Sequence, residues 1–272
     1  MHSPYQLIER QGIGMSNCQL FDVSGKVAIV TGGTRGIGYM IAEGLVKAGV
    51  KTYIASRKAD ACADAERELK KHGEAIAIAA DLSAPDAAGG FAAEMLKREP
   101  RIHILVNNAG ATWGAPFDDF PESGWDKIMD LNVRSIFFLT QQLAPALRAA
   151  GSEADPARVI NIGSVDGLTS PEMENFSYSA SKAALHHLTR HLAKHLGPAN
   201  INVNVIAPGP FETKMTAQVL KEFGDAIVKA IPRGRTGQAS DAVGTAIFLA
   251  SAASAYITGA VIPLDGGFST TR

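Results

Sequence analysis

The sequence predicts a single α/β domain, a doubly wound parallel sheet of about seven strands with helices on both faces. Three observations lead to this prediction. Short apolar runs rich in β-branched residues alternate with longer helical patterns, which is typical of parallel strands buried on both faces. The 272 residues carry 46% hydrophobic side chains, enough for one large core. Residues 21–272 contain no repeat, linker or low-complexity tract that would divide them.

The seven expected strands are apolar runs that recur along the chain. They span residues 26–31, 50–55, 75–80, 102–107, 159–162, 201–206 and 260–264. The expected helices span residues 39–48, 59–72, 85–98, 125–150, 178–196 and 241–251. Gly49 closes the first helix, as glycine past a last turn commonly does, and Pro145 predicts a kink or break in the long one. Residues 1–20 are expected to be a poorly ordered extension.

The composition and charge of the chain limit the kinds of binding partner that we expect. A net charge of −1 gives no reason to expect binding to nucleic acid or to an anionic membrane surface. No apolar run has transmembrane length, and the N-terminus lacks the pattern of a secretory signal. Cys18 and Cys62 form no metal or disulfide spacing, which fits a reduced cytoplasmic setting. We therefore expect a cytoplasmic protein whose partner is a small molecule.

The stretch Arg158–Leu185 holds the candidate catalytic residues. Ser164 follows a buried strand, and Tyr178 and Lys182 are four residues apart on the next helix, so they share one face. A cation beside a phenol is expected to lower its pKa toward the range useful for acid–base catalysis. Ser164 could then bond a carbonyl oxygen that Tyr178 protonates. The alternative is that Tyr178 and Lys182 only decorate a helix surface.

A glycine-rich turn after the first strand predicts a phosphate site. Its residues are Gly32, Gly33, Thr34, Arg35, Gly36, Ile37 and Gly38. Backbone amides at a helix N-terminus favour an anion there, as in Rossmann-type dinucleotide folds. The alternative is a tight turn that needs glycine for steric reasons.

Ser56, Arg57 and Lys58 end the second strand, where a carboxylate would select an unphosphorylated ribose. Arg57 and Arg35 instead favour NADP over NAD, unless both are solvated surface charges.

Taken together, these motifs resemble those of the short-chain dehydrogenase/reductase family. The resemblance covers about residues 24–267. Within the family, a narrower similarity is to bacterial reductases of 3-oxoacyl thioesters, including rhamnolipid-pathway reductases. It rests on the glycine turn, Asp81-Leu82, Asn107-Asn108-Ala109-Gly110, Asn132, Ser164, Tyr178 with Lys182, and Pro208-Gly209 with Thr213. The 14 residues from Ser164 to Tyr178 exceed the common family spacing by one, which places an extra loop residue beside the substrate.

The resemblance implies roles for these residues. Asp81 and Leu82 are expected along the adenine, and Asn108, Ala109 and Gly110 beside the cofactor. Lys182 also binds the nicotinamide ribose, Asn132 holds a water that links Lys182 to solvent, and Pro208, Gly209 and Thr213 contact the carboxamide side. The alternatives are that Asn107 and Asn108 satisfy strand-end backbone groups and that Asn132 bends its helix.

The expected activity is NADPH-dependent reduction of a carbonyl, or the reverse oxidation of an alcohol, with a 3-oxoacyl thioester as best substrate. Polyol, sugar-acid and steroid dehydrogenases are rivals on the same fold, and a non-catalytic NADP-binding sensor is a rival of another class. The resemblance also implies a homotetramer, or a dimer.

No metal is expected: His187, His191 and His195 have metal-compatible spacing without a carboxylate motif, so a structural or interface role is favoured for this helix.

Residues 210–235 are expected to form a substrate lid. Phe211, Met215, Val219, Leu220, Phe223, Ile227 and Ile231 recur at three- and four-residue steps, which predicts an amphipathic helix with its apolar face inward. Such a lid beside the nicotinamide, together with Trp113 and Pro116, favours an acyl chain over a sugar, whose hydroxyls would lose partners on burial. The alternative is a helix packed permanently on the core.

Overall fold

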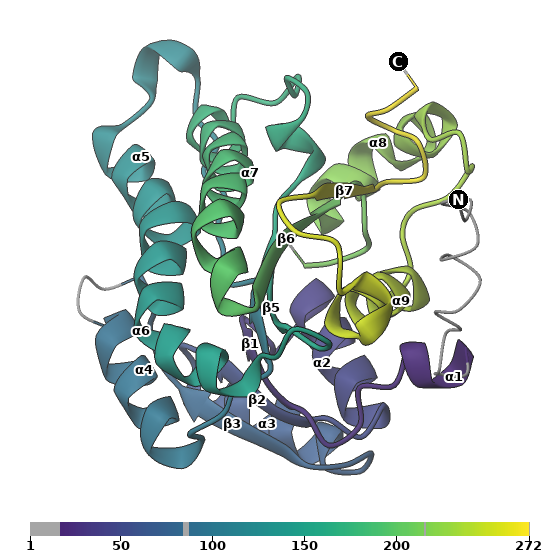
Figure 1. Ribbon diagram of the computed structural model, residues 1–272. Helices are drawn as coiled ribbons and strands as arrows, with labels where there is room; N and C mark the ends of the chain where they lie inside the picture. Colours follow the sequence, from purple (N-terminus) through teal and green to yellow (C-terminus); the bar gives the residue numbers. More distant parts are fainter. Residues whose placement is uncertain (1–16, 84–86, 215, 272) are drawn as a thin grey trace, which may run out of the picture.

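The computed structural model describes residues 17–83, 87–214 and 216–271. Its centre is a seven-stranded sheet in the order β3-β2-β1-β4-β5-β6-β7, with every pairing parallel. The chain starts in the middle at β1, reaches one edge at β3, returns to β4 beside β1, and continues to β7. Helices therefore cover both faces (Figure 1). The doubly wound fold predicted from the sequence is confirmed.

The observed bounds are close to the predicted ones. The strands are β1 Val27–Thr31, β2 Lys51–Ser56, β3 Ala75–Ala79, β4 Ile104–Asn107, β5 Ala157–Ile162, β6 Ile201–Pro208 and β7 Val261–Leu264. The helices are α1 Asn17–Leu20, α2 Gly36–Lys47, α3 Ala59–Leu69, α4 Ala87–Arg98, α5 Glu122–Met129, α6 Ser135–Ala150, α7 Phe176–Leu196, α8 Ala217–Ala230 and α9 Ala239–Ala250. Short 3₁₀ turns follow at Phe117–Asp119 (η2) and Val165–Gly167 (η4).

The long helix predicted over 125–150 is interrupted, but not at Pro145. A π-helical turn, η3, spans Asp130–Arg134 between α5 and α6, whereas α6 continues through Pro145. Prediction of a break at the proline was therefore wrong. The neighbouring turns of α6 carry buried residues such as Leu143 and Leu147, and this packing outweighs the loss of one backbone hydrogen bond.

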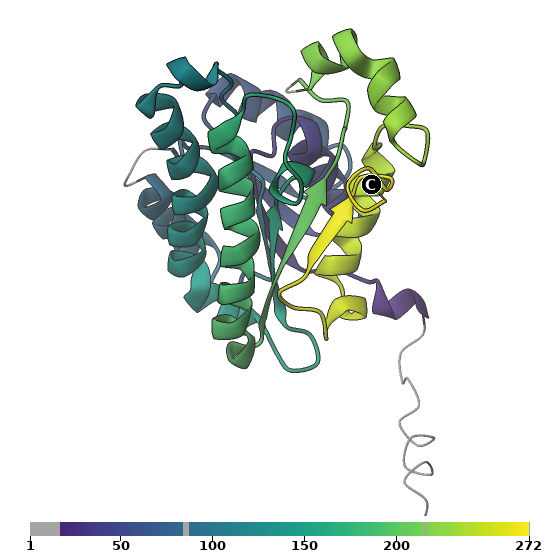
Figure 2. The ribbon, with the colours of Figure 1, turned by 90° about the horizontal axis from the view of Figure 1, so that it is seen from above.

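Two apolar layers sandwich the sheet. Val30 and Ile54 pack with α2 and α9 on one face, whereas Ile29 and Leu105 pack with α4, α6 and α7 on the other. Successive residues of β1 thus enter different cores because strand side chains alternate between faces. Figure 2 shows the two helical layers on either side of the strands. Since all strands are parallel, their carboxyl ends lie along the same end of the sheet, and the candidate site is at this end.

A chain of buried polar side chains crosses the middle of the sheet. Asn107 Nδ2 donates to Thr140 Oγ1 on α6 (3.2 Å) and to Asn161 Oδ1 on β5 (2.9 Å). Asn161 Nδ2 in turn donates to Thr189 Oγ1 on α7 (2.8 Å). These bonds fix β4 and β5 relative to α6 and α7. The side chain of Asn107 thus has a structural role, but it bonds other side chains and not the strand-end backbone groups named in the alternative.

The predicted lid forms the amphipathic helix α8, but its apolar face is not fully covered. Phe211 and Ile231, which flank α8, are buried, whereas α8 itself has no buried residue and Phe223 is 58% exposed. Figure 2 shows α8 projecting from the body of the molecule. In this structure α8 is therefore only partly covered by the rest of the protein. Met215 and residues 1–16 lie outside the described residues, and 17–20 form α1.

Candidate active site

The glycine turn between β1 and α2 is shaped by close approach of other backbone. Gly32 and Gly36 have φ of +65° and +56°, a region that disfavours side chains. A β-carbon on Gly38 would lie 2.3 Å from Asn108 Nδ2 and 2.6 Å from the Gly32 carbonyl oxygen. The glycines are therefore needed for the turn itself. The resulting backbone leaves the N-terminus of α2 open to an anion.

Asn108 holds this turn in place. Its Nδ2 donates to the carbonyl oxygens of Thr31 (3.0 Å) and Gly32 (3.1 Å). The backbone N–H groups of Asn108 and Ala109 both donate to Thr31 Oγ1 at 3.0 Å. The strand end of β4 is thus tied to that of β1. This bonding is what the backbone alternative for Asn108 anticipated, and it also fixes the wall of the expected cofactor cleft.

The segment after β6 reaches over the glycine turn. Pro208 ends β6, and Gly209 is so close to Asp265 that a β-carbon on Gly209 would lie 2.6 Å from Asp265 Cβ. Farther along, Thr213 Cγ2 lies 3.5 Å from the position that a β-carbon on Gly36 would take. The predicted residues Pro208, Gly209 and Thr213 therefore close one side of the cleft above α2.

Positive charge surrounds the expected ribose end. Arg35 and Arg57 are exposed, and neither forms an ion pair with any other described residue. Asp81 lies near Arg57; a hydrogen bond from Ser83, with help from Arg57, lowers the Asp81 pKa. Leu82 is buried under this edge. The other predicted positions lie close by in the chain: Thr34 and Ile37 at the turn, Ser56 at the end of β2, and Lys58 before α3.

The structure brings Ser164, Tyr178 and Lys182 together at the carboxyl end of β5. Ser164 is the N-cap of η4, and its hydroxyl is near enough to the Tyr178 phenol to act on the pKa of that group. Lys182 is 4% exposed, donates to the Ile162 carbonyl oxygen at 2.7 Å, and has its Nζ 5.5 Å from the centre of the Tyr178 ring. Two side chains from one helix face thus meet a third from a strand end.

Burial reverses the pKa expected for Tyr178. Desolvation raises the Tyr178 pKa to about 12, although the hydrogen bond with Ser164 lowers it. Desolvation also lowers the Lys182 pKa, to about 8. Burial disfavours both charged forms, the phenolate and the ammonium. The expectation that Lys182 lowers the Tyr178 pKa is therefore wrong for the protein by itself.

Asn132 lies in the π-turn η3 and is completely buried. Its Oδ1 accepts from the Ala111 N–H, and its Nδ2 donates to the Ala111 carbonyl and to Ser181 Oγ, each at 3.0 Å. Asn132 Oδ1 and Lys182 Nζ both approach Gly110, at 3.2 and 3.8 Å from the place of its missing β-carbon. Asn132 thus helps fix the floor of the site, and π-turns often occur at such places.

Two polar residues at the site were not predicted. Asp166 follows Ser164 by two residues, and its Oδ2 accepts from Asn175 Nδ2 at 3.1 Å. His186 is buried one turn beyond Lys182 and packs against Gly163 and Gly167. Desolvation lowers the His186 pKa to about 4, so its ring is neutral at neutral pH. Neither residue belongs to a sequence pattern, although a carboxylate two residues after a strand-end serine was a usable signal for Asp166.

A groove of about 360 Å³ includes Asn175, which accepts a hydrogen bond from the backbone N–H of Tyr178. It is lined by Thr112, Gly114, Ala115, Pro116, Met173, Glu174 and Asn175. Trp113, predicted to contribute to this wall, instead packs on α5, where its ring lies within 3 Å of the place of a β-carbon on Gly124. Pro116 is in the wall as expected.

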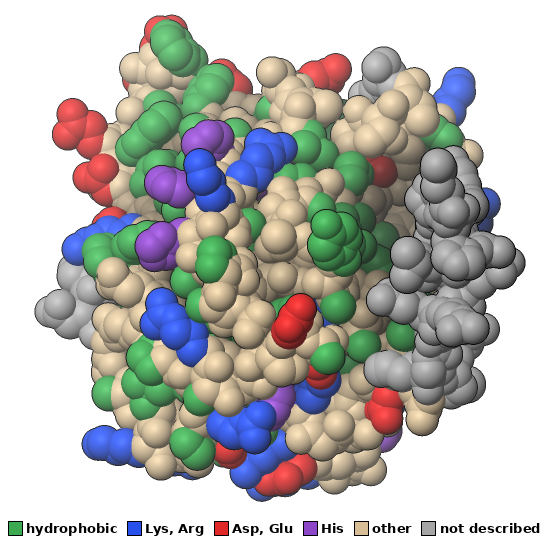
Figure 3. All heavy atoms as spheres, viewed as in Figure 1, with side chains coloured by type: hydrophobic (Ala, Val, Ile, Leu, Met, Phe, Trp, Pro, Cys, Tyr) green, Lys and Arg blue, Asp and Glu red, His purple; other side chains and the backbone are tan. Residues whose placement is uncertain are grey.

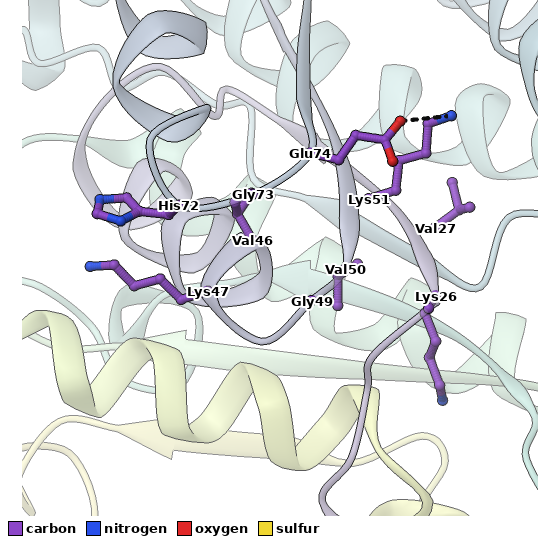
Figure 4. A pocket seen from close by; sticks show the side chains of 11 residues that line it. Lys26, Val27, Val46, Lys47, Gly49, Val50, Lys51, His72, Gly73 and Glu74 are labelled. Atoms are coloured by element: carbon purple, nitrogen blue, oxygen red, sulfur yellow. Dashed lines mark ion pairs between the residues drawn. The ribbon is translucent and has the colours of Figure 1, made fainter.

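A second hollow, of about 330 Å³, lies at the opposite edge of the sheet (Figure 4). Three lysines border it, but each has a carboxylate partner. Lys26 pairs with Asp155 at 2.7 Å, Lys47 with Glu43 at 3.1 Å, and Lys51 with Glu74 at 3.1 Å. These charges are already compensated, so the hollow has no cation available for a ligand.

The histidines of α7 do not converge on a metal. His187, His191 and His195 are exposed, and Figure 3 shows histidine side chains beside basic ones on the face over α7. Within residues 17–83, 87–214 and 216–271, no three His, Cys, Asp or Glu side chains are arranged to hold a metal ion. Over the same residues, no helix combines the length and apolarity needed to span a membrane.

The fold and the site are those of an oxidoreductase, and comparison with known sequences gives the same class of protein. Residues 32–269 match the family described as enoyl-(acyl carrier protein) reductase. The chain belongs to the short-chain dehydrogenase/reductase family. It is 49% identical over 250 residues to the rhamnolipids biosynthesis 3-oxoacyl-[acyl-carrier-protein] reductase of Pseudomonas aeruginosa, covering 91% of this chain and 98% of that one.

Other relatives act on different substrates. Gluconate 5-dehydrogenase of Gluconobacter oxydans is 35% identical over 261 residues, 94% of this chain and all of its own length. Among solved structures, the Pseudomonas aeruginosa RhlG/NADP active-site complex has a TM-score of 0.89 and 48% identity, covering 92% of this chain and 99% of that one. A Burkholderia cenocepacia gluconate 5-dehydrogenase with NADP and tartrate has a TM-score of 0.86 and 32% identity, with 93% and 98% covered.

Proposed function

We propose that the chain is an NADPH-dependent carbonyl reductase whose best substrate is a 3-oxoacyl thioester. The observation that carries the proposal is the meeting of Ser164, Tyr178 and Lys182 at the end of β5, on the sheet edge that also holds the glycine turn of β1. An acid–base group and an anion-binding turn on one edge suit hydride transfer from a dinucleotide.

The residues present fit NADP. The turn from Gly32 to Gly38 leaves no room for β-carbons beside Asn108, and the N-terminus of α2 is open to a pyrophosphate. Arg35 and Arg57 have no ion-pair partner among the described residues, so a ribose phosphate would supply one. We assign the adenine side to Ser56, Lys58, Asp81 and Leu82, and the nicotinamide side to Ala109, Gly110, Tyr178, Lys182, Pro208, Gly209 and Thr213.

The chemistry that the bound cofactor supplies is hydride transfer to the carbonyl carbon. Ser164 holds the carbonyl oxygen and Tyr178 gives it a proton. A Tyr178 pKa of about 12 keeps the phenol protonated at neutral pH, which suits the reductive direction. Lys182, protonated below its pKa of about 8, stabilises the phenolate left behind. Asn132 supports this arrangement and, as proposed from the resemblance, the return of a proton to Lys182.

Two features favour an acyl substrate. The groove beside the site has Ala115, Pro116 and Met173 in its walls, and α8 leaves apolar side chains such as Phe223 uncovered. Both are suited to an alkyl chain and would leave the hydroxyls of a sugar without partners. The relative at 49% identity is named as a 3-oxoacyl-[acyl-carrier-protein] reductase.

A sugar-acid dehydrogenase is the second candidate because gluconate 5-dehydrogenases share the fold and about a third of the sequence. Polyol and steroid dehydrogenases use the same fold. A non-catalytic NADP-binding sensor is disfavoured, since a sensor needs no Ser164-Tyr178-Lys182 arrangement. We further propose a cytoplasmic homotetramer, or a dimer, with no nucleic-acid or membrane partner.

The test is a substrate screen that follows NADPH absorbance with 3-oxoacyl thioesters, diketones, quinones and keto-sugar acids. Highest kcat/KM for a 3-oxoacyl thioester is the expected result. Higher kcat/KM for a keto-sugar acid would replace the substrate assignment, and NADPH binding without turnover of any carbonyl would favour the sensor.

A further inference from the structure

Asp166 places a carboxylate at the candidate reaction centre. Its backbone N–H donates to Ser164 Oγ at 3.1 Å, so the residue directly supports the serine expected to hold the carbonyl oxygen. Its side chain acts electrostatically on both Tyr178 and Lys182. The Asp166 carboxylate is therefore close enough to the candidate catalytic side chains to affect their charge states.

The position of Asp166 is fixed by packing. The η4 turn lies against α7 so closely that a β-carbon on Gly167 would be 2.7 Å from the Lys182 carbonyl carbon. On the other side, Asp166 Oδ2 accepts from Asn175 Nδ2, and Asn175 is itself 3% exposed and lines the apolar groove. The partly exposed carboxylate of Asp166 is thus linked through Asn175 to the wall of the groove.

A carboxylate without an ion-pair partner in this place costs free energy of folding, which suggests that it has a functional role. It is mostly withdrawn from water, which raises its pKa, and no described residue forms an ion pair with it at contact distance. Among the described residues, the Asp166 side chain forms a hydrogen bond only with the neutral amide of Asn175. Its field opposes an incoming anion and balances the nearby Lys182 cation.

We propose that Asp166 is a specificity residue that excludes substrates with a carboxylate near the reacting carbonyl and so selects neutral 3-oxoacyl thioesters over the corresponding 3-keto acids. This inference rests on the proposed function. Like charges brought together in a poorly solvated site repel strongly, whereas a neutral thioester has no such penalty.

The experiment compares two substrates that differ only beside the reacting carbonyl. S-acetoacetyl-N-acetylcysteamine is a neutral thioester, and acetoacetate has a carboxylate in the same place. Their kcat/KM ratio is measured with saturating NADPH for the wild type, Asp166→Asn and Asp166→Ala. Asparagine keeps the size of the side chain and can still accept the bond from Asn175.

The expected result is that Asp166→Asn raises kcat/KM for acetoacetate, relative to the thioester, by on the order of tenfold. Asp166→Ala should change the ratio in the same direction. Asp118→Asn is the matched control: it removes one carboxylate from exposed η2, two residues after Pro116 of the groove, and should leave the ratio unchanged. A ratio within twofold of wild type in both Asp166 variants would overturn the proposal.

A binding measurement separates this proposal from the proposed function. Calorimetry of acetoacetate with the NADP⁺-loaded protein requires no turnover, and Asp166→Asn should bind acetoacetate about tenfold more tightly than wild type. If the thioester is not reduced but this difference in affinity is found, the proposed function fails and the charge selection stands. Equal affinities would reject charge selection even in an enzyme that reduces thioesters.

Discussion

The ammonium nitrogen of Lys182 lies 5.5 Å from the centre of the Tyr178 ring, and both side chains are largely withdrawn from water. The Tyr178 pKa is nevertheless raised in the protein alone, because desolvation outweighs the lowering effect of Ser164. The phenol is held protonated beside a cation of moderate pKa. Such a pair is prepared to give a proton rather than to take one.

Tyr178→Phe should remove the transferable proton and keep the ring packing. We expect kcat to fall by about 10² to 10⁴-fold, the usual contribution of a general acid, while the Kd for NADPH measured by fluorescence changes little. An unchanged Tm would show that the fold is intact. Near-normal turnover in this variant would exclude Tyr178 from proton transfer.

The pH dependence of reduction should report Lys182. Its pKa is lowered to about 8, so the stabilising cation is present below this pH and is lost above it. Because Tyr178 stays protonated up to about pH 12, kcat/KM for reduction should fall with one ionisation near pH 8. The profile is measured from about pH 6 to 10. Constant kcat/KM up to pH 10 would contradict this role of Lys182.

Arg57→Asp should alter cofactor choice. Loss of a charge-assisted bond to the ribose phosphate and introduction of a repulsive carboxylate should weaken NADPH binding by about 10²-fold or more, with NADH affected less. Arg101→Asp is the control, since Arg101 is exposed at the opposite edge of the sheet, before β4. A wild-type preference for NADH, or equal effects of the two substitutions, would rule out the assignment.

The apolar groove and α8 predict a dependence on acyl length. We expect kcat/KM to rise from short to medium 3-oxoacyl thioesters, because each buried methylene contributes about 0.8 kcal/mol. Phe223→Ser should flatten this rise if α8 closes over the chain, whereas Glu222→Gln, on the same exposed turn, should not. A steep rise that survives Phe223→Ser would show that α8 does not contact the chain.

Assembly can be measured directly. The exposed α7 face and partly exposed Phe138 on α6 leave a surface suited to a second copy, and we expect light scattering at micromolar concentration to give a mass of four chains, or two. Replacement of exposed His191 by Glu should lower that mass if α7 is in the interface. A monomer in the wild type would contradict the expectation.

Local patterns in the sequence determined the fold and most of the candidate site. Buried strands of regular length fixed the parallel sheet, because β-branched apolar runs between helices have few other arrangements. The pairing of Tyr178 with Lys182 followed from helix periodicity. Glycine spacing identified the turn at Gly32–Gly38, since positive φ and close backbone approach exclude other residues.

Only the tertiary structure decided what depends on burial and on contacts between distant segments. The pKa of Tyr178 rises because the phenol is desolvated, a property that its sequence neighbours do not encode. Thr213 covers Gly36 because β6 lies on the same sheet edge as β1. Asp166 became a candidate because η4 packs on α7 and so brings Asp166 near Lys182. Desolvation and charge proximity are set by three-dimensional packing, so residue spacing alone predicted none of these.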